Sequence, residues 1–186
     1  SVDWSDKLKK EKCAYLMTPL IPSLTYGKTY EKELKKIKAS NPTKTQEQVE
    51  KLAKEKTYSF MKMSASAEES CKIEFSDDND RIYRKIKGAY CIDGQTDMNA
   101  LLMILKHIVF PIKRAFHVHK EDGTDCEYSS YEQLLEDWIT LKLKSKELKH
   151  NLTYYIIDII GPIRNWIEEN DHMREAAYPS PEMRSV

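Results

Sequence analysis

The chain has 186 residues, a formal net charge of zero and 40% hydrophobic residues, so it can form one medium domain or two small ones. It contains no apolar run of roughly eighteen residues and no secretory leader, which predicts a soluble, cytoplasmic protein with no membrane partner. The cysteines lack a CxxC pair, which predicts free thiols and no protein-bound metal; they are Cys13, Cys71, Cys91 and Cys126.

The first predicted element is a short buried strand at residues 14–20, "AYLMTPL", which ends in a loop at Pro19 and Pro22. The chain then becomes polar over residues 27–62. Apolar residues recur there at helical spacing and predict two amphipathic helices separated by "SNPT". Thr45 and Gln48 have the spacing of a capping box at the start of the second helix.

The lysine-rich segment allows two interpretations. Clustered ammonium groups can bind RNA phosphates and release counterions. Glutamates also stand among these lysines at helical pair spacing, as Glu31 with Lys35 and Glu50 with Lys54 do, which is typical of a solvated helix surface. The solvated surface is the primary interpretation, and RNA contact is the alternative.

The stretch "FMKMSAS" ends this segment. Lys62 is followed by small hydroxyl residues, and Ser66 stands three residues before Glu69, which is the spacing of a capped helix start. A lysine beside hydroxyls and free backbone amides at a helix start can hold a polyphosphate. By itself the string is a weak signal, and a simple capped helix start in a lysine-rich protein is the favoured interpretation.

The middle of the chain predicts two packed helices after a short extended piece at residues 71–77. One helix, in residues 80–91, places Ile82, Ile86 and Tyr90 on one face. The other is a strongly apolar helix over residues 100–114, with Pro111 near its end.

The C-terminal part predicts a β-hairpin followed by helices. The hairpin turns at Asp122 and Gly123. Helices are expected over residues 130–143 and 146–170, with a short segment at residues 172–178. The sequon at residues 151–153 falls inside a predicted helix, so we do not interpret it as a glycosylation site.

Two pairs of residues in this part have a structural and a functional interpretation. His117 and His119 alternate on a strand as two metal ligands would, but no further ligand stands at a diagnostic spacing, so surface histidines are favoured. Tyr154 and Tyr155 lie in an apolar helix and are predicted to be core residues. No glycine-rich phosphate loop is present, so a kinase or dinucleotide enzyme is not supported.

Seven segments in this order resemble the C-terminal half of eukaryotic and archaeal tyrosyl-tRNA synthetases, over nearly the whole chain except residues 26–60. They read "YLMTPLIPSLT", "KMSASAEESCKIEFSD", "IYRKIKGAYC", "ILKHIVFPIKRAF", "YSSYEQLLEDW", "ELKHNLTYYIIDIIGPIR" and "AAYP". The resemblance implies ATP-dependent activation of tyrosine and its transfer to tRNA(Tyr).

Within this resemblance, "KMSAS" is similar to the KMSKS loop of class I synthetases, which closes over ATP. Lys62 would stabilise charge on the leaving pyrophosphate, and Ser64 and Ser66 would hold phosphate oxygens. Ala65 stands where a second lysine is usual. ATP would carry its own Mg²⁺. The residues that the resemblance assigns to ATP are Leu20, Ile21, Pro22, Lys62, Met63, Ser64, Ala65 and Ser66.

The resemblance also implies a fold class and a domain division. The chain is expected to be mostly α, with the edge of a Rossmann-type catalytic domain at residues 1–70, a helical insertion at 28–60, and an anticodon-binding-type helical domain with a small β-hairpin at 71–186. The family's HIGH signature and tyrosine pocket have no counterpart here. The isolated chain is therefore expected to be inactive, and an identical subunit or a second synthetase half is the expected partner.

At the anticodon end, the family's aromatic platform falls near Asp122, which cannot stack on a base, and its carboxylate falls on Glu147. The preceding "LKSK" departs from the family's usual histidine-proline pair, which argues against specific anticodon reading by this copy. A chain that retains the KMSKS-type loop but departs from the family pattern at the anticodon site resembles one half of the double-length synthetases of certain protozoa. The alternative function is a non-catalytic tRNA-binding or structural module that kept only the fold.

Overall fold

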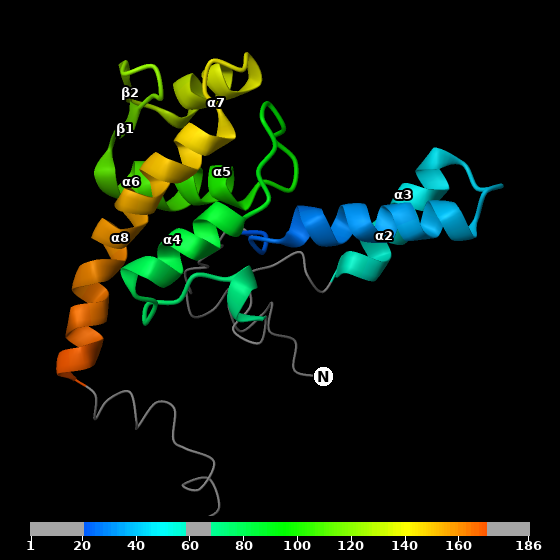
Figure 1. The fold of residues 1–186 in the computed structure, drawn as a ribbon, viewed down its shortest axis with the longest axis horizontal. Coiled ribbons are helices and arrows are strands. Elements are labelled where there is room, and N and C mark those ends of the chain that lie inside the picture. Colours follow the sequence, from blue (N-terminus) through cyan, green and yellow to red (C-terminus); the bar gives the residue numbers. More distant parts are fainter. Residues whose placement is uncertain (1–20, 59–67, 171–186) are drawn as a thin grey trace, which may run out of the picture.

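The lysine-rich segment forms a helical hairpin that projects from the rest of the chain in the computed structural model, which describes residues 21–58 and 68–170 (Figure 1). Its two helices are α2 (Tyr26–Ser40) and α3 (Gln46–Thr57). We call residues 26–57 the arm. The strand predicted at residues 14–20 and the segment predicted at 172–178 lie outside the described residues.

The arm confirms the predicted helices and their boundary. Thr45 caps α3, because its hydroxyl accepts from the Gln48 backbone N–H at 3.3 Å and the Gln48 side chain accepts from the Thr45 N–H at 3.2 Å. The apolar faces of the two helices meet in a small core of their own. Its buried members are Tyr30, Ile37, Val49 and Ala53.

The base of the arm is fixed to the body through Tyr90. The Leu24 N–H donates to the Cys71 carbonyl at 2.9 Å, and the Leu24 carbonyl accepts from the Tyr90 N–H at 2.7 Å. Gly27 is buried under the Tyr90 ring, where a Cβ would lie only 2.1 Å from Cδ1. The Tyr90 hydroxyl also donates to Glu31 at 2.9 Å. The start of α2 is therefore locked onto the body.

Hydrogen bonds decide which ion pairs form on the arm. Glu31 accepts from Tyr90 and not from Lys35, and Glu50 accepts from the Gln46 side chain at 2.8 Å. The pair that forms on the arm joins Glu33 and Lys36 at 2.7 Å. The pair spacing of Glu31 with Lys35 and of Glu50 with Lys54 therefore gives no ion pair here, because tertiary and neighbouring hydrogen bonds compete for these two carboxylates.

The body is a helical bundle with one small sheet, which confirms the predicted fold class. Its elements, in chain order, are η2 (Glu69–Cys71), α4 (Asn79–Gly88), α5 (Ala100–Ile104), η3 (Leu105–Val109), α6 (Phe110–Lys113), β1 (Phe116–His119), β2 (Asp125–Tyr128), α7 (Tyr131–Ile139) and α8 (Ser145–Glu169).

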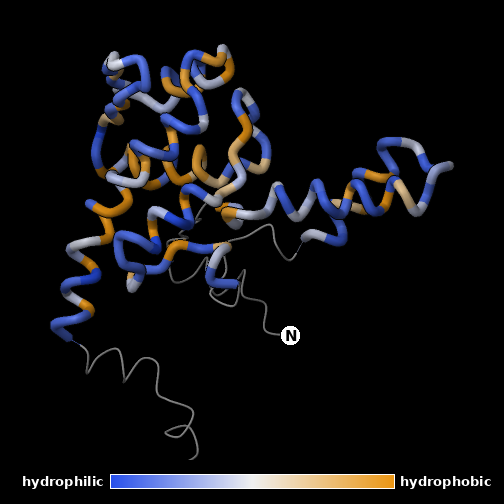
Figure 2. The backbone as a smooth tube through the Cα atoms, in the orientation of Figure 1, coloured by the Kyte–Doolittle hydropathy of each residue, from blue (hydrophilic) through white to orange (hydrophobic). Residues whose placement is uncertain are grey.

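The main core lies where α4, α5, α7, α8 and the sheet converge, and the hydrophobic stretches gather there (Figure 2). Ile82 and Ile86 of α4 are fully buried in it, as predicted, and Tyr90 is buried just beyond the helix end. The predicted neighbour of α4 was the helix at residues 100–114. The structure packs α4 mainly along α8, and α4 shares only the common core with α5.

The helical run at residues 100–113 is continuous but changes type in the middle. Residues 105–109 form a π-helical turn, in which the Phe110 N–H bonds to the carbonyl of Leu105. Pro111 has no N–H, and its ring would clash with the carbonyl four residues earlier in a regular α-helix. The wider turn accommodates the proline without ending the helix, a feature that the apolar periodicity did not predict.

The β-hairpin forms at the predicted turn and lies against α8. Gly123 has a φ of +82° in the turn, a conformation that favours glycine. The side chain of Asn151 in α8 accepts from the His119 N–H at 3.0 Å and donates to the His119 carbonyl at 3.1 Å. This buried amide belongs to the discarded sequon. It continues the hydrogen bonding of the sheet edge onto the helix.

The paired residues on β1 and α8 separate by burial. His117 and His119 are both exposed on one face, as predicted, next to Glu127 and Asp125 of the opposite strand. Tyr155 packs on Phe116 with ring centroids 4.9 Å apart, which confirms it as a packing residue. Tyr154 is 60% exposed, so the core prediction was wrong for it, because it lies on the solvent side of α8.

Two further features are absent from residues 21–58 and 68–170. No helix in these ranges is long and apolar enough to cross a membrane. The same ranges hold no group of three or more histidine, cysteine or acidic side chains that could bind a metal ion. Cys71, Cys91 and Cys126 are free.

Candidate functional site

A cavity of about 770 Å³ lies at the base of the arm. Pro22, one of the residues assigned to ATP, lines it, whereas Ile21 packs against the main core. Tyr58, at the end of α3, lines the same cavity and is 72% exposed. Leu20 and the loop of residues 62–66 lie outside the described residues; Pro22 follows Leu20 closely in the sequence, and Tyr58 is the last described residue before the loop.

The cavity is bounded by the arm on one side and by the loop before α5 on the other. Tyr26 and Lys54 come from α2 and α3, and Asp97 and Met98 come from the loop. Met98 has a φ of +57°, which is uncommon for a residue other than glycine, and its side chain packs on the core of the arm. The loop is therefore held in an unusual conformation against the arm.

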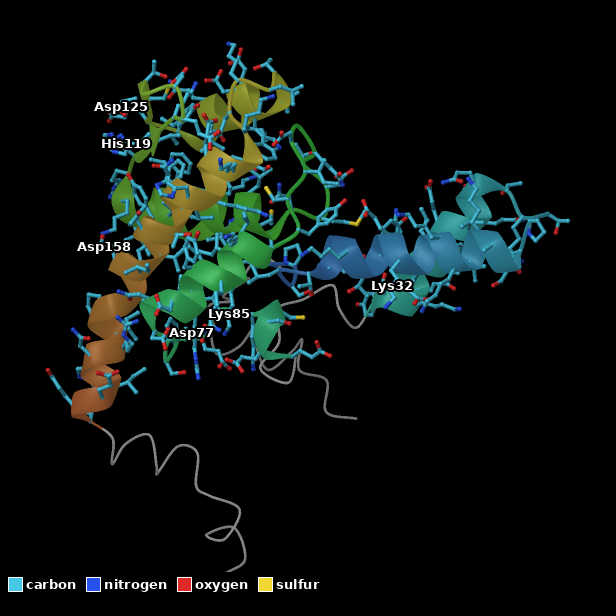
Figure 3. All side chains as sticks on the ribbon, viewed as in Figure 1. Lys32, Asp77, Lys85, His119, Asp125 and Asp158 are labelled. Atoms are coloured by element: carbon cyan, nitrogen blue, oxygen red, sulfur yellow. The ribbon has the colours of Figure 1, made fainter. Side chains whose placement is uncertain are left out.

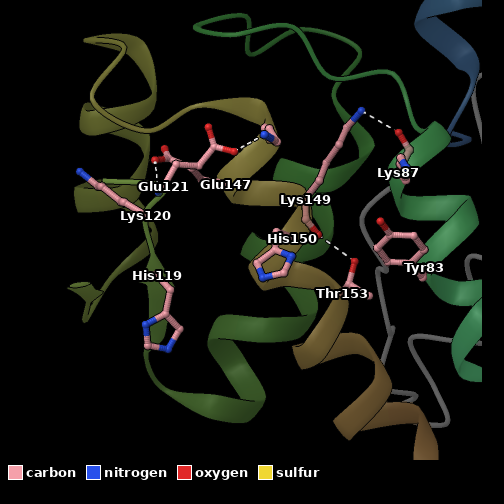
Figure 4. Close-up of a pocket in the computed structure, with 10 residues that line it drawn as sticks. Tyr83, Lys87, His119, Lys120, Glu121, Glu147, Lys149, His150 and Thr153 are labelled. Carbon is pink, nitrogen blue, oxygen red and sulfur yellow. Dashed lines mark hydrogen bonds and ion pairs between the residues drawn. The ribbon is translucent and has the colours of Figure 1, made fainter. Parts of the chain in front are cut away.

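A second cavity, of about 410 Å³, opens between α4, the β-hairpin turn and the first turns of α8 (Figure 4). Its lining combines cations, two carboxylates, one tyrosine ring and two histidine rings. The lining residues are Tyr83, Lys87, His119, Lys120, Glu121, Lys146, Glu147, Lys149, His150 and Thr153.

Glu147 lines this second cavity, and both of its carboxylate oxygens are engaged. One accepts from the Lys144 N–H at 2.9 Å and so caps α8, and the other accepts from the Glu121 N–H at 3.3 Å. A carboxylate offers about four lone-pair positions, so capacity for another donor remains. In this structure Glu147 holds the hairpin turn to the start of α8.

Asp122 lies at the tip of the hairpin turn and is not among the residues that line the cavity. Its carboxylate accepts from the Thr124 hydroxyl at 2.6 Å and from the Thr124 N–H at 2.9 Å. These bonds, led by the one from the hydroxyl, lower the pKa of Asp122 because they favour the charged form. The visible role of Asp122 is to shape the turn.

The cations of the second cavity differ in environment. Lys146 pairs with Glu121, and this bond raises the pKa of Lys146. Lys149 donates to the carbonyls of Lys87 at 3.1 Å and Ala89 at 2.8 Å, at the C-terminal end of α4. Burial lowers the pKa of Lys149, since the charged ammonium loses water there.

Sequence reasoning missed the aromatic groups of this cavity. Tyr83 of α4 and His150 of α8 line it from two elements that are distant in sequence (Figure 4). The available signal was weak: Lys146, Lys149, His150 and Thr153 fall at helical spacing on one face of α8. The partner face on α4 could not be inferred from that pattern.

Comparisons with known proteins identify relatives of one kind. A family model described as class I tRNA synthetases (W and Y) matches residues 55–160. A tyrosine-tRNA ligase of Natronomonas pharaonis is 36% identical over 124 residues, which cover 63% of this chain and 36% of the relative. That of Saccharolobus solfataricus is 30% identical over 175 residues, covering 93% of this chain and 43% of the relative.

A solved structure is also similar to this chain. The crystal structure of tyrosyl-tRNA synthetase from Aeropyrum pernix superposes with a TM-score of 0.65 at 26% identity, over 94% of this chain and 41% of that chain. The present chain thus spans well under half the length of the proteins it matches.

Proposed function

The chain belongs to the class I tRNA synthetases of the tryptophan and tyrosine type, and we propose that it is part of a tyrosine-tRNA ligase. The observation that carries this proposal is the family match over residues 55–160, which includes the "KMSAS" loop. Tyrosine is favoured over tryptophan because the relatives that align over most of this chain are tyrosine-tRNA ligases. The tyrosyl resemblance seen in the sequence is confirmed.

In this proposal Lys62 acts on the phosphates of ATP during tyrosine activation. Its ammonium stabilises the negative charge that develops on the leaving pyrophosphate, and Ser64 and Ser66 orient phosphate oxygens. The cavity beside Pro22 and Tyr58 supports this assignment, because it provides a space at the point where the loop joins the described chain. ATP brings its own Mg²⁺ to this site.

The proposal requires a partner that supplies the rest of the catalytic site. This chain corresponds to 36–43% of the two curated relatives described above. The HIGH signature and the tyrosine pocket would come from further sequence of the same protein, and dimerisation or a second synthetase half would complete the enzyme. We place the protein in the cytoplasm, as the names of relatives from Encephalitozoon cuniculi and Gallus gallus state for those proteins.

The second cavity supports a contact with unpaired bases at the anticodon end. Unpaired bases are bound by stacking on aromatic rings and by hydrogen bonds to their edges. Tyr83 and His150 offer rings beside Glu147, whereas Asp122 offers none. We propose that these three residues contact the RNA here, with Glu147 as the acceptor of a base N–H.

The ligase proposal is tested by Lys62→Ala in the full-length protein. Tyrosine-dependent ATP–pyrophosphate exchange should slow by about 10²–10³-fold, as when another strong charge-stabilising contact is removed. Lys51→Ala, which removes an exposed lysine from α3, is the matched control and should leave the exchange rate unchanged. Unchanged exchange in Lys62→Ala would exclude the loop from the chemistry and favour a non-catalytic module.

A further inference from the structure

We infer that the outer face of α2 and the groove between α2 and α4 form one continuous surface that binds the phosphate backbone of RNA. The inference rests on the proposed function only for the identity of the anion as RNA. It names a surface outside the two cavities described above. For α2, it also replaces the solvated-surface interpretation of the lysine-rich segment with the alternative, RNA contact.

The first observation is that the charges of the arm are segregated. Lys28, Lys32 and Lys35 are exposed at positions i, i+4 and i+7, so they lie on one face of α2, opposite the face that is buried against α3. Figure 3 labels Lys32 on this helix. Within the described part of the chain, no carboxylate lies within 4.0 Å of these three ammonium groups. Glu31 lies next to this face, but its half-buried carboxylate accepts from the Tyr90 hydroxyl, whereas α3 intersperses both signs as a merely solvated helix would.

The second observation is a groove of about 530 Å³ that continues this face onto the body. Lys28 lies at its edge, where its ammonium donates to the Gly88 carbonyl at the end of α4. Arg81 and Arg84 line it as well, together with Thr25, Ser70 and one acidic residue, Glu69. Cationic side chains thus outnumber the single carboxylate in the groove, and cations beside hydroxyl residues are a composition suited to phosphate oxygens.

The arginines of the groove differ in how far they are already paired. Arg81 lies 3.7 Å from Glu69 and 3.8 Å from Asp78, which partly neutralise it. Arg84 bonds through Nε to the Asp80 carbonyl at 3.3 Å, and no described carboxylate pairs with its guanidinium. Lys85 is neutralised by Asp77 beneath the surface. Among the α4 cations that line this groove, Arg84 is therefore the one without a carboxylate partner in the described part of the chain, and it is available to an outside anion.

The dimensions fit a nucleic-acid strand. Seven residues of α-helix separate Lys28 from Lys35, which corresponds to about 10 Å along the axis, a span over which a nucleic-acid strand presents several phosphates. The lysine face carries none of the large apolar residues that a membrane-surface helix needs. The lysine face offers positive charge without apolar residues that could insert into a membrane, so it suits RNA better than a lipid surface.

The test compares two triple variants of the 186-residue chain by the binding of a labelled tRNA(Tyr) transcript and of an RNA hairpin of unrelated sequence. Lys28→Gln/Lys32→Gln/Lys35→Gln should weaken binding of both RNAs at least tenfold at about 50 mM salt. It should also reduce the slope of log K against log salt by about 3, because three phosphate contacts are lost. Lys44→Gln/Lys51→Gln/Lys56→Gln removes the same charge from exposed positions in the turn and α3, outside the three cavities described here, and should change both quantities little.

Equal weakening by the two triple variants, or no weakening by either, would overturn the inference. Circular dichroism checks that the variants keep their helices. If the first variant loses helix because the bond from Lys28 to Gly88 is gone, Lys32→Gln/Lys35→Gln should still reduce the slope by about 2. Pyrophosphate exchange needs no RNA, so a negative result here leaves the ligase proposal standing, and a negative exchange result leaves the RNA surface standing.

Discussion

Lys85 and Asp77 form an ion pair inside the body, where the Lys85 ammonium lies 2.7 Å from both carboxylate oxygens of Asp77 (Figure 3). The side chain of Asp77 is fully buried and that of Lys85 is 7% exposed. The Asp77 carboxylate also accepts from the Glu74 N–H at 2.8 Å, and its backbone carbonyl accepts from Arg164 of α8 at 2.7 Å. One residue thus connects the turn before α4, α4 itself and α8.

The first prediction concerns this pair. Asp77→Ala should lower the free energy of unfolding by about 3–5 kcal/mol, because it leaves a buried ammonium without its counter-charge. Urea denaturation of the chain measures the change. Glu33→Ala breaks the pair with Lys36 at the surface and should leave the free energy of unfolding nearly unchanged, because water screens this pair. Equal costs for the two substitutions would contradict the structural importance given to the buried pair.

The second prediction tests how the arm is attached. Gly27→Ala places a methyl group where the Tyr90 ring lies, so the ring must move and its hydrogen bond to Glu31 must break. We expect a loss of about 1–3 kcal/mol, typical of overpacking, and faster amide exchange at the base of α2. Gly88→Ala is the matched control, since its Cβ would meet nothing within 4 Å. Normal exchange at the base of α2 in Gly27→Ala would show that Tyr90 does not hold the arm.

Features built from adjacent residues could be predicted from the sequence. The capping box of Thr45 and Gln48 and the turn at Gly123 depend on hydrogen bonds and backbone preferences within three or four residues, so the local sequence determines them. The same holds for the buried face of α4, because apolar spacing along one helix identifies Ile82 and Ile86.

Contacts between distant residues could not be predicted in this way. Glu31 lies 59 residues from Tyr90, and nothing in the helical spacing indicates that this tyrosine displaces Lys35 as its partner. The exposure of Tyr154 depends on which side of α8 receives the β-hairpin, which is a tertiary choice. The second cavity likewise needs α4 and α8 to be side by side, so its aromatic residues were found only in the structure.

The third prediction concerns alkaline pH. Burial raises the pKa of the Cys91 thiol to about 11, above its ordinary value of 9.0. The unfolded chain releases this proton first, so stability is full below pH 9 and falls as the pH rises toward 11, by up to about 3 kcal/mol. Burial also raises the pKa of Tyr128, which acts in the same direction. Urea denaturation between pH 8 and 11 should show the decline, and Cys91→Ala should make it shallower. An unchanged pH slope in Cys91→Ala would contradict the assignment.

The fourth prediction concerns the contact between α8 and the sheet. Asn151→Ala removes an amide that bonds both backbone groups of His119, and it leaves those groups unsatisfied against the helix. The expected cost is about 2–3 kcal/mol, together with faster amide exchange at His119. Asn165→Ala changes an exposed asparagine of the same helix and should cost less than about 0.5 kcal/mol. Protection of the His119 amide in Asn151→Ala would argue against this account.

The fifth prediction separates the arm from the chemistry. The arm has its own core, and its two helices run side by side, so a short Gly/Ser turn can replace residues 33–55 in the full-length protein while the contact of Tyr90 with Glu31 is kept. Tyrosine-dependent pyrophosphate exchange should stay within about twofold of the parent, because that step involves no RNA. Charging of tRNA should fall in its kcat/KM by several-fold, since Lys35 is lost from the lysine face of α2 and its phosphate contact with it, while Lys28 and Lys32 are kept. A loss of exchange equal to the loss of charging would instead mean that the arm supports the ATP site itself.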